Sequence, residues 1–427
     1  MPKKIMAHLF EDNPPENITL VRKLFVNREN DIRFCLDFFQ AGETFPKVLA
    51  VHGKTRCGKS HLVRYLLSEV QDKQLPYQVF IVNANARGDA EAVLDDLFYS
   101  LEQAISGLDP DQVPDGVHEP YEAAIPFLRS MKELILGEKH SVDLARTREA
   151  LSSDSFSMKL APPPFELSGA NTVSLKEGVE ERWTRKRPLL HEMVELIRYE
   201  ADLLAHLHKG SRVVLLVDDL DLLDRPKGSG KQQANLLLDY LKPLAEPETI
   251  TLLATTRPEY YNERSKDLKN FRAVRVMDGA AIRSVYERHI ELFNAGDPVF
   301  DDAALEWLDK IAEGRVGIFL QRCYQIWSHF YGQETPALLG LKEVKEYIAV
   351  ELDELRSEPR HAEFFLKIEE TVRAGKLDLV FKGDLDESGV LYGLLSPTPG
   401  RPDAFTLNHV YAQVLKERLS INEKQTL

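Results

Sequence analysis

Residues 53–60 read Gly-Lys-Thr-Arg-Cys-Gly-Lys-Ser and match the pattern G-x-x-x-x-G-K-[ST]. The apolar run 48–51 precedes this stretch, and apolar residues at helical spacing follow it, as expected for a strand and a helix. Glycines let the backbone curl so that its N–H groups point at phosphate oxygens, near the positive end of the following helix. A chance glycine loop is the alternative, and the strand–loop–helix context argues against it. The stretch therefore predicts a loop that binds the phosphates of a nucleotide.

Each residue type in this loop has an expected task. We expect Lys59 to reach the β- and γ-phosphates of the nucleotide and Ser60 to bind Mg²⁺. Cys57 is interpreted as a small residue that fits the loop, and sensitivity to oxidation is the alternative. The residues that we assign to nucleotide binding are Gly53, Lys54, Thr55, Arg56, Cys57, Gly58, Lys59, Ser60 and His61.

Composition narrows the classes of function. The chain has 427 residues, enough for roughly two to four domains. Its net charge of −14 weighs against broad non-specific binding of nucleic acid, although it leaves room for a local basic patch. The chain has neither a secretory signal nor an apolar run of about 20 residues, and its three cysteines lie far apart. We therefore expect a cytoplasmic protein without a membrane segment.

A second motif lies at the end of the apolar run 213–217, which is followed by Asp218 and Asp219. A run that is apolar throughout is typical of a parallel strand buried on both faces. Carboxylates at the carboxyl end of such a strand lie where open α/β sheets bind ligands. We expect Asp218 to hold the Mg²⁺ and Asp219 to polarise the attacking water. The alternative is a buried strand followed by an acidic turn without a function. The presence of the phosphate loop in the same chain argues against this alternative.

Further strands are predicted at 77–83, 249–254 and 271–276. The strand 249–254 ends in Thr255-Thr256-Arg257, whose polar groups would face the γ-phosphate. The sequence thus predicts an α/β protein with a parallel-sheet nucleotide domain at 21–278, after a leader at 1–20. Within it, residues 107–185 have scattered prolines and are interpreted as an insertion. A hairpin at 165–175 and a basic run at 182–187 are expected in or beside this insertion, before a long helix at 188–207.

The remainder of the chain is expected to be mostly helical. Residues 279–335 have three amphipathic stretches and are interpreted as a helical lid domain. Residues 336–427 combine two helical stretches, a hairpin formed by 390–395 and 404–407, and a last helix at 408–419. This order favours a winged-helix-like domain. Its acidic balance favours a protein-contact or autoinhibitory module over a DNA-binding one.

Four stretches in this order resemble the AAA+ and STAND branches of P-loop ATPases, especially relatives of archaeal replication initiators. They are the segment 25–29, the Walker A loop 53–60, the Walker B strand 213–221 and the sensor-1-like stretch 254–261. The first is similar to F-x-G-R-E, with Asn27 in place of the usual glycine. The resemblance implies ATP and Mg²⁺ as cofactors, a contact of Arg28 near the adenine, and a γ-phosphate-side role for Arg257.

Several positions depart from the family pattern. Asp219 stands where AAA+ proteins usually have glutamate, which is one methylene longer, so hydrolysis is expected to be slow unless Asp221 assists. In the lid, the position of the family's arginine falls on Gly317. Either Arg315 substitutes for that arginine or the contact is absent. Arg264 and Arg272 are weak candidates for an arginine finger.

These observations favour an ATP-binding and hydrolysing molecular switch whose nucleotide state controls assembly with a protein partner or with further copies of itself. By resemblance alone, such a switch fits a bacterial conflict or defence system. One alternative is a DNA-binding ATPase similar to initiators or transposition regulators, contacting DNA through the C-terminal hairpin or the run 182–187. Another is a nucleotide-bound scaffold with little hydrolysis.

Overall fold

A computed structural model describes Phe10 and most of the chain between residues 18 and 426. The described ranges are 18–40, 47–84, 87, 89–136, 190–209, 211–223, 232–245, 249–294, 296–330, 338–357, 362–380, 394–397 and 404–426. The chain divides into two compact units, which are described separately. The sheet unit comprises residues 33–52 and 66–273, and the helical unit comprises residues 1–32, 53–65 and 274–427.

Five parallel strands form the sheet, in the order β2-β3-β4-β1-β5. Their bounds are β1 (Val48–His52), β2 (Tyr77–Asn83), β3 (Arg212–Asp218), β4 (Ile250–Thr256) and β5 (Asn270–Ala273). The central strands β3 and β4 are almost wholly buried, as their apolar sequences predict. The expected strand 271–276 ends at Ala273, because its partner β1 ends at His52 and the pairing ends with it.

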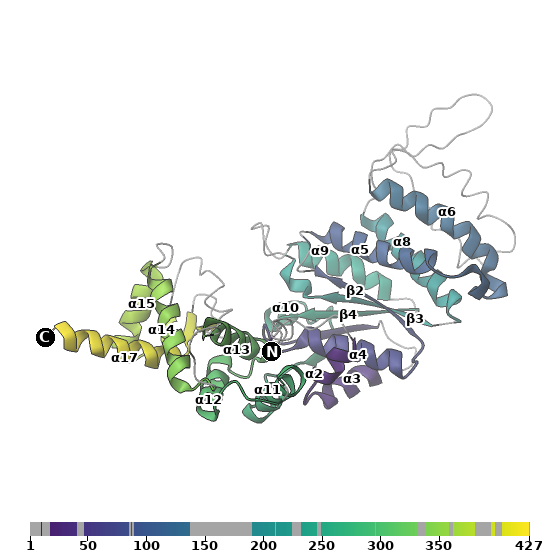
Figure 1. The fold of residues 1–427 in the computed structure, drawn as a ribbon. Helices are drawn as coiled ribbons and strands as arrows, with labels where there is room; N and C mark the ends of the chain where they lie inside the picture. The colour runs from purple at the N-terminus through teal and green to yellow at the C-terminus, as the bar shows by residue number, and fades with distance from the viewer. Residues whose placement is uncertain are drawn as a thin grey trace. The chain divides into compact units, whose positions relative to one another are not determined.

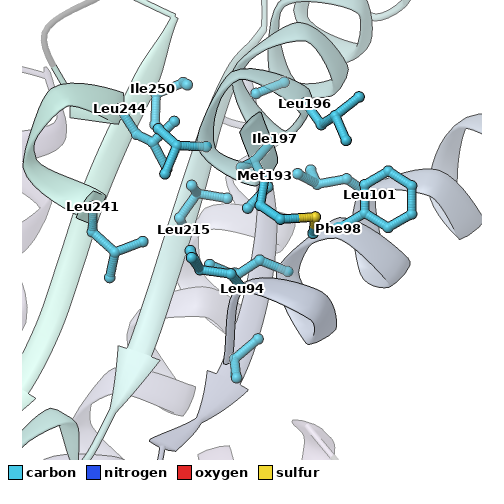
Figure 2. Close-up of a cluster of buried hydrophobic side chains, with 14 of the residues drawn as sticks. Leu94, Phe98, Leu101, Met193, Leu196, Ile197, Leu215, Leu241, Leu244 and Ile250 are labelled. Carbon is cyan, nitrogen blue, oxygen red and sulfur yellow. The ribbon is translucent and has the colours of Figure 1, made fainter. Parts of the chain in front are cut away.

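Helices α5 (Ala90–Ser106), α8 (Leu190–Leu207) and α9 (Gln232–Leu241) lie over one face of the sheet (Figure 1). Asp89 caps α5 by accepting a hydrogen bond from the backbone N–H of Ala92 at 2.9 Å. Apolar side chains from these helices and from β3 and β4 meet in one core, which Figure 2 shows in close-up. It includes Leu94, Phe98, Leu101, Met193, Leu196, Ile197, Leu215, Leu241, Leu244 and Ile250.

Helix α6 (His118–Ile135) is an element that the sequence analysis did not predict, because prolines are scattered through this region. Pro120 lies in the first turn, where a missing N–H is tolerated, but Pro126 lies inside the helix. A buried apolar stripe still holds the helix, and Phe127 packs edge-on against Tyr199 of α8. Residues 118–135 of the expected insertion therefore belong to the main core. The expected hairpin 165–175 and basic run 182–187 lie outside the described residues.

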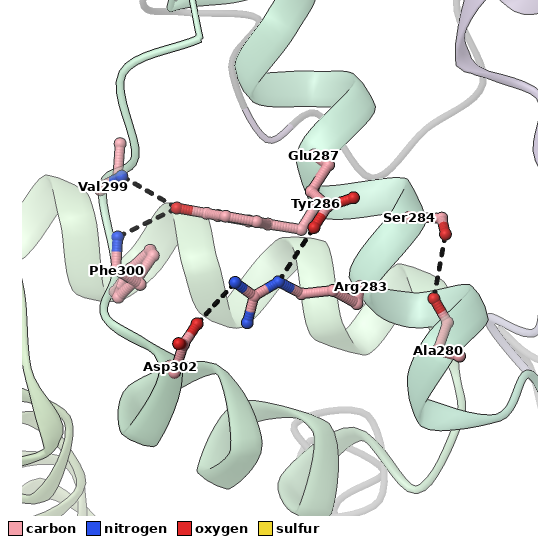
Figure 3. Close-up of polar contacts among 8 residues, drawn as sticks. All are labelled: Ala280, Arg283, Ser284, Tyr286, Glu287, Val299, Phe300 and Asp302. Carbon is pink, nitrogen blue, oxygen red and sulfur yellow. Dashed lines mark hydrogen bonds and ion pairs between the residues drawn. The ribbon is translucent and has the colours of Figure 1, made fainter.

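The chain also forms α2 (Ile18–Leu24), α3 (Glu29–Gln40), α4 (Lys59–Asp72) and the short α10 (Pro258–Glu263). In the helical unit, the lid comprises α11 (Gly279–Phe293), α12 (Asp302–Ala312) and α13 (Val316–Phe330). Asp278 and Asp301 cap α11 and α12. Figure 3 shows the Tyr286 hydroxyl accepting hydrogen bonds from the N–H groups of Val299 and Phe300, at 2.8 and 3.0 Å. These bonds fix the connection between α11 and α12.

The C-terminal part has the helices and the small sheet of a winged-helix-like arrangement. Its elements are α14 (Leu341–Ser357), α15 (Ala362–Arg373), β6 (Asp378–Val380), β7 (Leu395–Pro397), β8 (Ala404–Leu407) and α17 (His409–Thr426). The strands are antiparallel in the order β6-β8-β7. The expected strand at 404–407 is present, but the strand that pairs with it is Leu395–Pro397 and not 390–395, and β6 is an additional strand. Residues 390–393 lie outside the described residues. The predicted fold class is confirmed: a parallel α/β sheet, followed by a helical lid and a small winged-helix-like part.

The lid and the C-terminal part share one hydrophobic core. Buried side chains form a continuous cluster from Ile282 of α11 to Leu415 of α17. Within it, Arg322 of α13 donates to Glu351 of α14 at 2.8 Å and to the hydroxyl of Tyr411 of α17. Tyr411 in turn donates to Glu351 at 2.8 Å. Described residues on both sides of the expected boundary between 335 and 336 contribute to this cluster.

Candidate functional site

The loop 53–60 continues the chain from the residue at which β1 ends, and α4 begins within it at Lys59. Arg56 and Gly58 have positive φ angles of 63° and 94°, which bend the loop through left-handed conformations. At Gly53, a Cβ atom would lie 2.6 Å from the carbonyl oxygen of Val274. Glycine at position 53 is therefore required by the close approach of another backbone, and Gly58 by its conformation.

Lys59 is held inside the loop. Its side chain is buried, and its Nζ donates to the carbonyl oxygens of Gly53 and Lys54, at 3.0 and 3.3 Å. The ammonium charge is thus fixed at the curve of the loop and does not extend into solvent. Ser60 follows in the first turn of α4 and is half-buried.

The Cys57 thiol is buried, and its Sγ lies 3.8 Å from the carbonyl oxygen of Val274. Burial raises the pKa of this thiol, although Lys59 and Arg28 lower it in part. A buried thiol with a raised pKa is a poor nucleophile and is not readily oxidised. This geometry supports the interpretation of Cys57 as a small packing residue.

His61 and Arg28 contact other parts of the helical unit. The Nε2 atom of His61 lies 3.1 Å from the carbonyl oxygen of Val21, and its ring lies edge-on to Phe25. Burial lowers the pKa of His61, so the neutral ring with a proton on Nε2 satisfies this contact. The guanidinium of Arg28 donates to the carbonyl oxygen of Cys57 at 2.6 Å. Both residues therefore hold the N-terminal segment against the loop and the start of α4.

In the sheet unit, Thr255 connects the acidic residues at the end of β3. Its hydroxyl donates to Oδ1 of Asp218 and accepts a hydrogen bond from the N–H of Asp219 at 2.7 Å. Asp219 has a φ angle of 54°, in the left-handed region that costs energy for a residue with a side chain. The Thr255 bond therefore helps to hold both the carboxylate of Asp218 and the turn at Asp219.

Asp221 and Arg257 form a pair at the same strand ends. The buried carboxylate of Asp221 accepts from the backbone N–H of Arg257 at 3.1 Å and from its Nε atom. Asp221 is therefore occupied in orienting Arg257. The neighbouring Thr256 is fully buried, and its hydroxyl has no hydrogen-bond partner among the residues that the structure describes.

The sequence pattern indicates only that Thr255, Thr256 and Arg257 are polar residues at a strand end. The bonds that Thr255 makes and the pairing of Arg257 with Asp221 are evident only in the structure. The two weak arginine-finger candidates also have contacts within the sheet unit. Arg264 forms ion pairs with Asp239 and Asp267, and the guanidinium of Arg272 lies 5.2 Å from the ring centre of Phe34.

The start of lid helix α13 contacts the loop directly. The N–H of Gly317 donates to the carbonyl oxygen of Arg56 at 2.9 Å. A Cβ atom at Gly317 would lie 2.9 Å from the Cβ of Arg56, so the position at which the sequence resemblance would place an arginine is here a place of close packing. Arg315 is buried and its Nε donates to the carbonyl oxygen of Ala312 at 3.1 Å. Its side chain is engaged with its own helical segment.

The donor types of the predicted metal residues fit Mg²⁺. Ser60 offers a hydroxyl oxygen and Asp218 a buried carboxylate, and Mg²⁺ prefers oxygen ligands with only one or two carboxylates. Among the described residues there is no group of three or more His, Cys, Asp or Glu side chains that could hold a metal by themselves.

Comparison with known proteins gives structural likeness at low identity. No protein-family model matches the chain, and a comparison with curated proteins finds no relative. The chain is similar to the Aeropyrum pernix ORC1 protein, solved in complex with DNA, at 13% identity over 93% of this chain and 94% of that chain, with a TM-score of 0.43. It is also similar to the Aeropyrum pernix ORC2 protein, solved with ADPNP and ADP. The identity is 12% over 97% of this chain and 98% of that chain, with a TM-score of 0.46.

A third similar structure is that of C. elegans PCH-2. It shows 11% identity over 84% of this chain and 74% of that chain, with a TM-score of 0.37. Separately, no helix in the described part of the chain is both long and apolar enough to cross a membrane.

Proposed function

We propose that this protein binds and hydrolyses ATP and uses the nucleotide as a molecular switch. The observation that carries the proposal is the loop 53–60, with its left-handed Arg56 and Gly58 and the Lys59 ammonium fixed at its curve. A curled backbone before a helix, with a lysine inside it, is suited to binding a chain of phosphates. Gly53 to His61 are proposed to bind the nucleotide.

Asp218, with Ser60, is proposed to ligate Mg²⁺, and Thr255 sets the orientation of its carboxylate. When bound, Mg²⁺ neutralises charge on the phosphates that it bridges. Asp219 is proposed to orient the attacking water. The buried hydroxyl of Thr256, which has no partner within the described residues, is suited to a further polar contact with the ligand.

Hydrolysis is proposed to be slow. Asp219 has a shorter side chain than glutamate, and its backbone is constrained in a left-handed conformation. Asp221 is engaged by two donors of Arg257, so it is poorly placed to act as a second base. Both features favour a protein that stays in its ATP-bound state for a long time before the ATP is hydrolysed. The scaffold with little hydrolysis is the limiting case of this proposal.

The switch is proposed to act through the lid. Because the N–H of Gly317 is bonded to the loop at Arg56, a change of loop conformation on binding ATP acts directly on the start of α13. The two nucleotide states then differ in the contacts that they make, as a switch requires. A protein partner, or further copies of this chain, would bind differently to the two states of the lid. The role in conflict systems and the DNA-binding alternative stay predictions from the sequence, since the basic run 182–187 lies outside the described residues.

Lys59→Ala tests the proposal. We expect the purified full chain to bind ATP with Mg²⁺ and hydrolyse it slowly, and the variant to lose hydrolysis by about 100-fold or more. Lys73→Ala is the control, because Lys73 is an exposed lysine just after α4 that forms an ion pair with Glu69. If Lys59→Ala hydrolysed ATP as fast as Lys73→Ala does, the loop would have no part in the reaction.

The switch is tested by the size of the full chain with ATP, with ADP and without nucleotide, measured by light scattering. We expect the ATP-bound protein to differ in assembly state, alone or with cell extract, from the ADP-bound protein. If the assembly state and the proteolysis pattern were the same in all three conditions, the protein could still be an ATPase, but the proposed switch would be wrong. Retention of duplex DNA that weakens as salt is raised would instead favour the DNA-binding alternative.

A further inference from the structure

Arg28 connects three distant segments of the helical unit. Its guanidinium is only 7% exposed and donates through Nη2 to the carbonyl oxygens of Cys57 and Arg275, at 2.6 and 3.0 Å. Nη1 lies 3.3 Å from the carboxylate of Asp31. Arg28 follows Asn27, which has a φ angle of 57°. The chain therefore adopts a left-handed conformation, which asparagine tolerates better than most residues, just before the residue that contacts the loop.

Two neighbouring contacts strengthen this arrangement. The ring of Phe25 stacks on Tyr65 of α4, with ring centres 3.8 Å apart, and the carbonyl oxygen of Val21 contacts His61. The N-terminal segment 21–28 thus holds the loop and the start of α4 at three points. A single guanidinium suits the central point, because it is always charged and its fixed fork of donors can serve several oxygens at once.

We propose that Arg28 is a positioning residue that orients the phosphate loop through the carbonyl group of Cys57. A peptide unit is planar and trans, so the carbonyl of Cys57 and the N–H of Gly58 point in opposite directions. When Arg28 holds that carbonyl, the N–H of Gly58 is turned to the opposite side of the loop backbone. The same guanidinium holds the carbonyl of Arg275, which fixes the loop against the segment that follows β5.

This inference rests on the proposed binding of ATP, and it gives Arg28 a different role from the adenine contact implied by resemblance. A residue that contacts adenine affects recognition of the base. A residue that shapes the loop affects every ligand that carries the phosphates. ATP, GTP and inorganic tripolyphosphate therefore distinguish the two roles.

The experiment compares Arg28→Gln and Arg28→Lys with the wild-type full chain. We expect Arg28→Gln to raise the Kd for ATP, GTP and tripolyphosphate by the same factor, about 10- to 100-fold, as loss of a charged hydrogen bond would. Arg28→Lys keeps the charge but not the fork, so a smaller increase is expected. Hydrogen exchange at residues 53–60 without nucleotide should accelerate in both variants. Arg33→Gln is the control, because Arg33 is an exposed arginine in helix α3, which begins directly after Arg28.

The outcomes separate the possible failures. If wild type binds none of the three ligands, the proposed function fails. If wild type binds them and Arg28→Gln binds them equally well, only the positioning role fails. Weaker binding of ATP with unchanged binding of tripolyphosphate would assign Arg28 to the base. Should Arg28→Gln not fold, as judged by circular dichroism, Arg28→Lys carries the same comparison.

Discussion

Threonine-to-valine substitutions in β4 should have opposite effects at two positions of the same strand. Thr251 and Thr255 are both fully buried, and both would exchange a hydroxyl for a methyl group of similar size. The Thr255 hydroxyl bonds with Asp218 and with the N–H of Asp219, whereas the Thr251 hydroxyl has no partner among the described residues. Only the hydrogen bonding differs, so the pair isolates its contribution.

The magnitude follows from the bonds that each substitution removes. Thr255→Val loses one hydrogen bond to a charged carboxylate and one to a backbone N–H, and should lower the free energy of unfolding of the sheet unit by about 2–4 kcal/mol. Thr251→Val removes a buried hydroxyl that is already unpaired, so it should be neutral or stabilising by about 1 kcal/mol. Thr255→Ser keeps the hydroxyl and loses one methyl group, which costs about 1 kcal/mol.

Hydrogen exchange of the β3 and β4 peptides under increasing urea measures the opening free energy of the sheet unit in the intact protein. Thr255→Val should also need more Mg²⁺ for hydrolysis, because the carboxylate of Asp218 loses the bond that orients it. The reasoning is refuted if Thr255→Val destabilises the unit no more than Thr251→Val does, or if Thr255→Ser is as damaging as Thr255→Val.

Two further predictions concern Glu200 and Gly317. The Glu200 carboxyl is fully buried, and burial together with the charge of Glu102 raises its pKa well above its ordinary value of 4.5. Below about pH 4.5 the folded and the unfolded protein both keep this proton, so Glu200 does not lower the free energy of unfolding. As the pH rises from there towards the raised pKa, the free energy of unfolding falls by about 1.4 kcal/mol per pH unit, because only the folded state keeps the proton. Glu200→Gln should abolish this pH dependence, as measured by hydrogen exchange of α8. Gly317→Ala should destabilise the contact between α13 and the loop by about 1–3 kcal/mol, seen as faster exchange of residues 316–320, because its Cβ would meet Arg56. Gly116→Ala is the control, since a Cβ there meets nothing within 4 Å, and equal exchange in the two variants would contradict the close packing at Gly317.

Local patterns in the sequence predicted the loop, the buried strands and most helices. The loop was predictable because its chemistry requires particular residues at fixed spacing, and β3 because an unbroken apolar run suits a strand covered on both faces. Helix α6 was missed because its prolines were given more weight than its apolar stripe, although tertiary packing supplies most of the stability of a helix.

Long-range contacts were beyond sequence patterns. Arg28 and Arg275 are 247 residues apart, and nothing in either local sequence indicates that one guanidinium joins them. Thr255 was recognised as polar, but its two bonds depend on the pairing of β3 with β4. The strand order, with β1 between β4 and β5, likewise arises from packing of the whole sheet.

The shared core of α11 to α17 limits how the helical unit can be divided. Arg322, Glu351 and Tyr411 each come from a different helix, so removing any one of these helices would leave buried polar groups of the other two unpaired. A winged-helix-like part from another protein could therefore not be grafted after α13 without rebuilding the lid. Because one core joins these helices and the small sheet, we expect the lid and the C-terminal part to move together as one body.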